Sequence, residues 1–281
     1  MDHTIGLVVK SDPKAQTQAL ALEKWLKAKG CRVLRKADTE AVTNVANAAP
    51  ADLFCVLVLG GDGTFLSAVR WLGDHTIPIL GIKYGEVGFL AEVAEEHLYP
   101  AVEAVLNNQF ALTSRIRLSI EVHLHNEIVA RETVLNDVVI NKGALARLAQ
   151  ITTWVDDDYL TDFRADGLIV ATPTGSTAYS LAAGGPVMHP AVSGILLTPI
   201  CPFTLTNRPL IVPQTACIKI QLGEKASDIM VTFDGQRGLP IDEQHTILVR
   251  KSPHPVNLIT LPEKNFFDVL RTKLRWSGGR T

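Results

Sequence analysis

The sequence predicts an α/β protein with a doubly wound N-terminal domain, followed by a β-rich, sandwich-like C-terminal domain. Three observations lead to this fold class. Over about the first hundred residues, apolar runs of strand length alternate with segments of helical periodicity. From Thr113 onward, many short strand-like runs follow one another between turns. At 281 residues, the chain is long enough to build two such domains.

In the N-terminal part, the pattern of apolar residues predicts alternating strands and helices. Strands are expected at residues 5–9, 31–34, 52–59 and 77–82, and helices at 14–29, 39–49 and 64–72. Gly30 ends the first helix, and Pro50 ends the second. The run from Leu53 to Leu59 is continuously apolar, as expected of a strand that is covered on both faces. This alternation predicts a parallel, doubly wound sheet.

In the C-terminal part, the sequence pattern predicts strands almost throughout. They are expected at residues 114–125, 128–140, 149–155, 159–163, 167–171, 209–212, 216–222, 229–233 and 247–251. Residues 265–276 have the apolar spacing of a helix that docks against a domain.

Composition and charge exclude several classes of function. The net charge of −2 provides no cationic field for a nucleic-acid backbone. The N-terminus lacks the pattern of a signal peptide, and the longest apolar run is too short to span a bilayer. The four cysteines are scattered, as expected of reduced thiols. We therefore expect a cytoplasmic protein that uses neither nucleic acid nor a membrane.

A glycine-rich loop follows the most apolar predicted strand. Gly60, Gly61 and Gly63 allow positive φ angles and a close approach of phosphate, and Thr64 can cap the following helix. Asp62 would repel phosphate unless it accepts a proton from an attacking hydroxyl, helps to hold Mg²⁺, or does both. The alternative is an ordinary strand–helix turn in which Asp62 caps the helix. The patterns G-x-G-x-x-G and G-x-x-x-x-G-K-[ST] are absent.

A second cluster surrounds the predicted strand at 167–171. Arg164 and Asp166 precede this strand, and a stretch rich in hydroxyl groups and small side chains runs from Thr172 to Pro186. Small side chains leave the backbone open to a flat ring, and Tyr179 offers an aromatic face for stacking. The alternative is a short capped helix without a ligand.

Taken together, these segments resemble the NAD kinase family over nearly the whole chain. The resemblance is carried, in the family's order, by Gly60–Thr64, Asn136–Asp137, Thr172–Pro186, Phe233–Gln236 and Lys273–Ser277. The first of these alone is shared with diacylglycerol and sphingosine kinases. The resemblance implies transfer of the γ-phosphoryl group of ATP, or of a phosphoryl group from polyphosphate, to the 2′-hydroxyl of the adenosine ribose of NAD, which gives NADP.

The resemblance also implies roles for individual residues. Asp62 matches the catalytic base, with Gly63 beside it, and Gly60, Gly61, Gly63 and Thr64 match the phosphate loop. Asp137 stands where the family more often has Glu, so the carboxylate is retained on a shorter side chain. The NAD-binding residues implied are Asp62, Gly63, Asn136, Asp137, Arg147, Arg164, Asp166, Thr177, Ala178, Tyr179, Ser180, Leu181, Ala182 and Gln236.

The family further implies the domains, cofactors and assembly. The first domain would comprise residues 1–113, rejoined by residues 263–281, and the β-rich NAD-binding domain would comprise residues 114–262. Mg²⁺ or another divalent metal would assist the reaction, although the sequence does not identify its ligands. A homodimer or homotetramer is expected. Two alternatives are a lipid or sugar-phosphate kinase with the same loop and a non-catalytic NAD(H)-binding sensor, which would not need Asp62.

Overall fold

The computed structural model describes residues 3–37, 49–84, 88–91, 93–125, 127–143, 148–224, 228–261 and 266–276. The chain forms two compact units, which are Met1–Ser114 with Val256–Thr281, and Arg115–Pro255. The first unit is α/β and the second is β-rich, so the predicted fold class is confirmed. None of the described helices is both long enough and apolar enough to cross a membrane.

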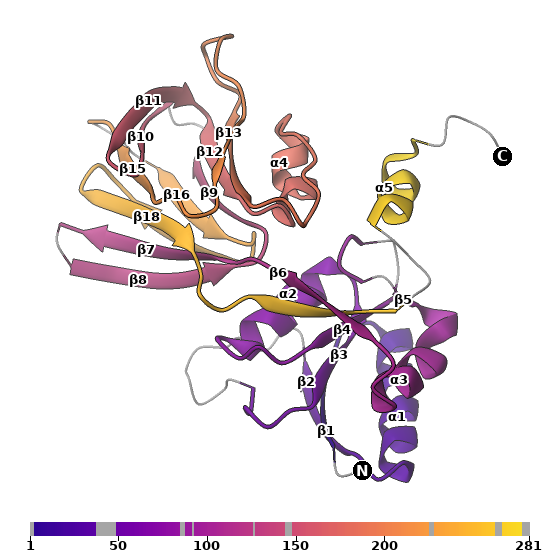
Figure 1. Ribbon diagram of the computed structural model, residues 1–281. Helices are drawn as coiled ribbons and strands as arrows, with labels where there is room; N and C mark the ends of the chain where they lie inside the picture. Colours follow the sequence, from indigo (N-terminus) through magenta and orange to yellow (C-terminus); the bar gives the residue numbers. More distant parts are fainter. Residues whose placement is uncertain are drawn as a thin grey trace. The chain divides into compact units, whose positions relative to one another are not determined.

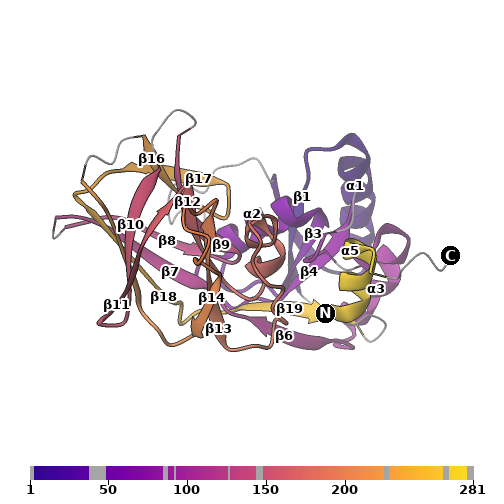
Figure 2. The ribbon, with the colours of Figure 1, turned by 90° about the horizontal axis from the view of Figure 1, so that it is seen from above.

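A parallel sheet forms the centre of the first unit. Its first four strands are β1 (Thr4–Val9), β2 (Arg32–Ala37), β3 (Cys55–Gly60) and β4 (Ile79–Lys83), in the order β2-β1-β3-β4. All three of these pairings are parallel. The chain first moves to one side of β1 and then to the other, as in doubly wound folds. Helices α1 (Pro13–Ala28) and α3 (Leu98–Leu106) cover one face, and α2 (Asp62–Leu72) covers the other (Figures 1 and 2).

Local sequence explains the first elements of this unit. The Asp12 carboxylate accepts hydrogen bonds from the first turn of α1, and Gly30 follows the helix with a φ of 83°. The apolar side of α1 packs on the sheet through Ala15, Ala19, Leu22 and Leu26, which are all buried. Every residue of β3 is buried, because this central strand has helices on both faces.

The remaining elements of the first unit come from two distant parts of the chain. After β4 come β5 (Val93–Ala94), the 3-10 helix η2 (Glu95–His97), α3 and β6 (Ala111–Arg115). Strand β19 (Val256–Thr260) enters the sheet between β4 and β6, and α5 (Phe266–Leu274) follows it with Leu270 buried. The return to the first unit therefore starts at β19, before the expected residue 263.

The second unit is a pair of antiparallel sheets. One, in the order β11-β10-β15-β18-β7-β8, contains β7 (Leu118–Leu124), β8 (Glu127–Val134), β10 (Ala149–Val155), β11 (Asp158–Ala165), β15 (Ile218–Leu222) and β18 (His245–Lys251). The other, in the order β14-β13-β12-β9-β16-β17, contains β9 (Asp137–Lys142), β12 (Gly167–Ala171), β13 (Gly194–Ile200), β14 (Leu210–Pro213), β16 (Ile229–Phe233) and β17 (Arg237–Ile241).

A single apolar core joins these two sheets, so the expected sandwich-like arrangement is present. The core takes alternate residues of β7 and β15 from one sheet and of β9, β12 and β16 from the other. Strand β12 is buried along its whole length, because a second cluster around Ile169 and Met188 covers its outer face. The segment that leads to Met188 includes the 3-10 helix η3 (Gly175–Thr177) and α4 (Tyr179–Ala182).

Some predicted elements differ from the observed ones. The run 128–140 is two strands in different sheets, β8 and β9, with a break at Leu135–Asn136. The run 114–125 is likewise divided between β6 and β7. Strand β13 is absent from the predicted strands. It contains Pro199, which lies beyond the part of β13 that pairs with β14, Gly194–Leu197. The helix expected at 39–49 lies almost wholly outside the described residues.

Candidate functional site

The glycine loop joins β3 to α2 in the first unit. Gly61 is the N-cap, and α2 begins at Asp62, so Thr64 lies inside the first turn rather than at the cap. None of the loop glycines has a positive φ, so the expectation that the loop needs glycine for positive φ angles is wrong. A Cβ on Gly60 would lie 2.4 Å from the Thr64 hydroxyl, whereas Cβ atoms on Gly61 and Gly63 would meet no atom within 4 Å. Packing thus requires glycine at 60, while 61 and 63 leave the backbone open to a ligand.

The Asp62 carboxylate is held by two backbone donors. The Phe89 N–H donates to Oδ2 at 2.8 Å and the Leu90 N–H donates to Oδ1 at 3.0 Å. A Cβ on Gly88 would lie 1.9 Å from Oδ1, so this approach requires glycine. Each carboxylate oxygen has two lone pairs and retains the capacity to accept another hydrogen bond. Asp62 is therefore an oriented, partly exposed acceptor at the start of a helix.

Sequence reasoning missed Gly88, Phe89 and Leu90. The signal that pointed to them is modest: a glycine followed by two apolar residues shortly after the buried strand β4. The same segment is linked to the C-terminal helix, because the Lys273 ammonium lies 5.8 Å from the centre of the Phe89 ring. The tail of the chain therefore reaches the residues that orient Asp62.

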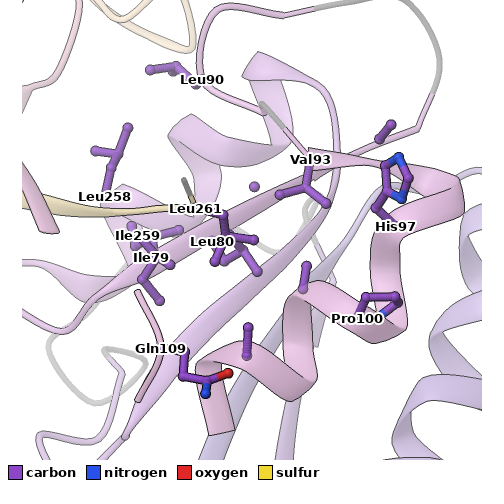
Figure 3. A pocket seen from close by; sticks show the side chains of 14 residues that line it. Ile79, Leu80, Leu90, Val93, His97, Pro100, Gln109, Leu258, Ile259 and Leu261 are labelled. Carbon is purple, nitrogen blue, oxygen red and sulfur yellow. The ribbon is translucent and has the colours of Figure 1, made fainter. Parts of the chain in front are cut away.

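An apolar cavity of about 390 Å³ lies between the sheet and α3 in the first unit (Figure 3). Its polar lining side chains are His97 and Gln109, which is a poor environment for a triphosphate. Leu90 lines this cavity and also donates its N–H to Asp62. The other lining residues are Ile79, Leu80, Gly81, Val93, Ala94, Pro100, Ala101, Ala104, Leu258, Ile259 and Leu261.

The break between β8 and β9 is the centre of a second cluster, in the second unit. The N–H groups of Leu135, Asn136 and Asp137 all donate to the carboxylate of Asp234, at 2.9, 2.7 and 3.1 Å. In return, the Asp234 N–H donates to the Asp137 carbonyl at 2.9 Å. These bonds replace the strand ladder at the break, which explains why the strand-like run 128–140 does not form one long strand.

The start of the hydroxyl-rich stretch packs against the other side of this turn. The Thr172 N–H donates to the Asn136 carbonyl at 2.9 Å, and the Thr172 hydroxyl donates to the Leu135 carbonyl at 2.6 Å. A Cβ on Gly175 would lie 2.0 Å from the Asn136 carbonyl oxygen. The structure thus brings together Asn136–Asp137, the beginning of the stretch 172–186, and the turn that contains Gln236.

The other predicted residues of the stretch differ in exposure. Tyr179 is 47% exposed, so its ring is available for stacking. Ser180 is fully buried and its hydroxyl bonds to that of Thr198 at 2.8 Å, so its side chain faces the protein interior. Thr177 donates its hydroxyl hydrogen to the Thr174 carbonyl. Ala178, Leu181 and Ala182 lie at or near the surface of the same segment.

Arg164 and Asp166 lie apart from this cluster. In the β9–β12 ladder, Ala171 pairs with Asp137 and Gly167 pairs with Asn141, so Asp166 is at the opposite end from Asn136. Four steps of roughly 3.4 Å along β12 separate its two ends, Gly167 and Ala171, by roughly 14 Å. Asp166 is 3.4 Å from the Lys142 ammonium, and the Arg164 guanidinium lies over the Phe203 ring. Arg147 falls outside the described residues.

Burial changes the acidity of the Asp137 carboxyl. Its pKa is raised from 3.8 to about 7, chiefly because burial disfavours the charged form and also because the Asp234 charge is near. Between these pKa values, the folded protein binds a proton that the unfolded chain has released. The contribution of Asp137 to the free energy of unfolding is therefore most favourable below about pH 4. It becomes less favourable as the pH rises to about 7, and is constant above that.

Asp137→Asn is expected to remove this loss of stability, because the amide cannot ionise. Urea unfolding should show that the free energy of unfolding of the variant, relative to that of the unchanged protein, increases between about pH 4 and about pH 7. A constant difference across this range would contradict the buried-acid assignment.

Among the residues that the structure describes, no three His, Cys, Asp or Glu side chains are grouped so that they could hold a metal ion. The carboxylates of the two clusters do not form a complete metal site by themselves. A metal ion at either cluster would need ligands from a substrate or from water.

Two family models match the chain. The ATP-NAD kinase N-terminal domain matches residues 5–110, and the ATP-NAD kinase C-terminal domain matches residues 135–261. Among curated relatives, the NAD kinase of Desulfatibacillum aliphaticivorans is 55% identical, over 98% of this chain and 99% of its own length. The NAD kinase of Geobacter sulfurreducens is 43% identical, over 94% and 95% of the two chains.

Solved structures give the same result for the fold. An NAD kinase from Archaeoglobus fulgidus in complex with ATP has a TM-score of 0.78 and 25% identity, covering 97% of this chain and 98% of its own. A yeast NADH kinase complexed with NADH has a TM-score of 0.89 and 24% identity, covering 100% of this chain and 89% of its own.

Proposed function

The chain belongs to the NAD kinase family, and we propose on that basis that it transfers the γ-phosphoryl group of ATP to the 2′-hydroxyl of the adenosine ribose of NAD, giving NADP. The observation that carries the proposal is the oriented Asp62 carboxylate in the open glycine loop. A fold can serve many functions, so the proposal depends on this side chain as well as on family membership.

Asp62 supplies what the reaction needs chemically. A ribose hydroxyl is a poor nucleophile at neutral pH and requires a base within hydrogen-bond reach. The Phe89 and Leu90 N–H groups hold the carboxylate in one orientation, while its remaining lone pairs can accept the hydroxyl proton. Gly61 and Gly63 leave room for phosphate oxygens beside the backbone at the N-terminus of α2.

The second unit supplies the residues that bind NAD. We assign the adenosine to Asn136 and Asp137, whose backbone is fixed on both sides by Asp234 and Thr172. Tyr179 presents an exposed ring for stacking. Gln236 follows Asp234 in the turn between β16 and β17, and we assign to it a contact with the same ligand.

Mg²⁺ fits these residues as a companion of the triphosphate. In phosphoryl-transfer sites, Mg²⁺ is held by substrate phosphates and water together with one or two carboxylates. The described residues contain no complete metal cluster, and Asp62 offers one carboxylate beside the phosphate loop. Once bound, Mg²⁺ would neutralise the charge that develops on the transferred phosphoryl group.

One assay separates this function from its alternatives. The protein is incubated with Mg²⁺, NAD and either ATP or polyphosphate, and NADP is measured by enzymatic cycling. We expect NADP with ATP, and the polyphosphate arm establishes whether it is a second donor. Phosphorylation of diacylglycerol or a sugar phosphate without NADP would favour the other kinases that share the loop. Thermal stabilisation by NAD without NADP would favour a sensor.

We also propose that the enzyme acts in the cytoplasm as a homodimer or homotetramer, as expected for this family. Sedimentation equilibrium of the purified protein tests the assembly. A monomer at micromolar concentration would contradict it.

A further inference from the structure

The carboxylate of Asp234 is arranged like an anion bound in a pocket of backbone donors. Its Oδ1 accepts the N–H groups of Asn136 and Asp137, and its Oδ2 accepts that of Leu135. Three consecutive N–H groups that converge on one anion form a tight cradle. Hydrogen bonds to a charged acceptor are also stronger than those between neutral groups.

The backbone conformation of Asp234 shows that surrounding contacts hold this residue in place. Asp234 adopts a φ of 49° and the following Gly235 a φ of 62°, in the turn between β16 and β17. A left-handed conformation is uncommon for a residue other than glycine and persists where surrounding contacts hold it. The Asp234 N–H, which donates to the Asp137 carbonyl, is one such contact.

The opposite side of the turn is held by different groups. Thr172 donates to the carbonyl oxygens of Leu135 and Asn136, through its hydroxyl and its N–H respectively. The N–H groups of the turn thus donate to Asp234, and two carbonyl oxygens of the same turn accept from Thr172. Asp234 is the charged member of this arrangement, and it lies 98 positions beyond Asn136 in the chain.

We propose that Asp234 is a positioning residue for NAD, which holds the Asn136–Asp137 backbone so that both side chains are presented to the adenosine. This inference rests on the proposed function, because that function assigns Asn136 and Asp137 to NAD. Asp234 acts through the turn and does not itself touch the reacting atoms. Its loss should weaken NAD binding and leave the phosphate loop of the first unit unaffected.

Two substitutions test the inference by steady-state kinetics. Asp234→Ala removes all three acceptor contacts and should raise the KM for NAD at least about tenfold, with the KM for ATP changed by less than about twofold. Asp234→Asn keeps one oxygen for Asn136 and Asp137 but turns an amide toward the Leu135 N–H. It should therefore recover part of the loss.

Asp156→Asn is the matched control. Asp156 also has a positive φ, of 56°, and its carboxylate accepts one backbone N–H, that of Cys217 at 2.8 Å. It lies in the turn between β10 and β11, outside the proposed site. This variant should keep the KM for NAD of the unchanged protein. A rise equal to that of Asp234→Asn would contradict a specific role for Asp234.

Two further measurements test the inference independently of the kinetics. Amide hydrogen exchange of the unchanged protein should show Leu135, Asn136 and Asp137 protected, and exchange at the rate of exposed loop amides would overturn the proposal. In Asp234→Asn, loss of the negative charge should lower the pKa of Asp137, so the stability loss between about pH 4 and about pH 7 should shrink.

The outcomes for this inference and for the function are distinct. If the unchanged protein forms no NADP, the proposed function fails. If it forms NADP and both Asp234 variants keep the KM for NAD within about twofold, the function stands and the positioning role is wrong.

Discussion

Asp62→Asn is expected to reduce kcat by a factor of about 10²–10⁴, which is the usual contribution of a positioned base. The amide keeps one oxygen and can still accept from Phe89 or Leu90, so the helix start should fold normally. It cannot take the proton of the ribose hydroxyl. Because the proposed adenosine contacts are in the second unit, NAD should still bind, as isothermal titration calorimetry can measure.

Asp52→Asn is the matched control for this substitution. Asp52 is an exposed aspartate in the turn before β3, in the same unit, and its contact with Arg32 is loose at 3.9 Å. The variant should keep the kcat of the unchanged protein. Unchanged kcat in Asp62→Asn would remove Asp62 from the mechanism, and loss of kcat in both variants would point to an effect of charge alone.

Gly88→Ala is expected to lower kcat by about as much as Asp62→Asn, at least about 10²-fold, without a direct change to the acid. The new Cβ would lie 1.9 Å from Asp62 Oδ1, closer than side-chain atoms can approach. The carboxylate must therefore move away from the Phe89 and Leu90 N–H groups and lose its orientation. A misplacement of about 1 Å can cost about 10²-fold in rate.

Gly238→Ala provides the comparison, because glycine is replaced by alanine in a strand where the nearest atom is the flexible end of Met230, at 3.2 Å. Its kcat should stay close to that of the unchanged protein. Activity in Gly88→Ala within about twofold of that control would show that the orientation of Asp62 does not limit the reaction. Thermal unfolding of both variants separates a local displacement from loss of the fold.

The parts of the fold that sequence patterns predict are those with local causes. Strand β3 is an uninterrupted apolar run, and α1 has a capping aspartate, a regular apolar side and a terminating glycine. The glycine loop is visible because all its residues are adjacent in sequence. The point where the chain returns to the first unit was predicted too late, at residue 263. Its first element, Val256–Thr260, is a short run whose partner, β4, is far away in the chain.

In the candidate site, too, the sequence predicts only the features that have local causes. Asp62 stands out as an acid among glycines, but the need for Gly88 arises only when the segment after β4 packs on Asp62. The break at Leu135–Asn136 was hidden because its cause, Asp234, is distant in sequence. Nothing in the strand-like run from 128 to 140 identifies the remote carboxylate to which its backbone donors turn. The family resemblance implied Asn136 and Asp137 as binding residues, and only the structure shows which groups hold their backbone.

The proposed mechanism depends on Asp62 taking a proton from the adenosine ribose. A crystal structure of the protein with NAD bound measures this most directly, through the distance from the Asp62 carboxylate to the ribose 2′-hydroxyl oxygen. If Asp62 is the base, we expect a separation of about 2.6–3.2 Å, or one bridging water. A carboxylate that faces only the Phe89 and Leu90 N–H groups, with the ribose hydroxyl beyond the reach of a bridging water, would contradict it.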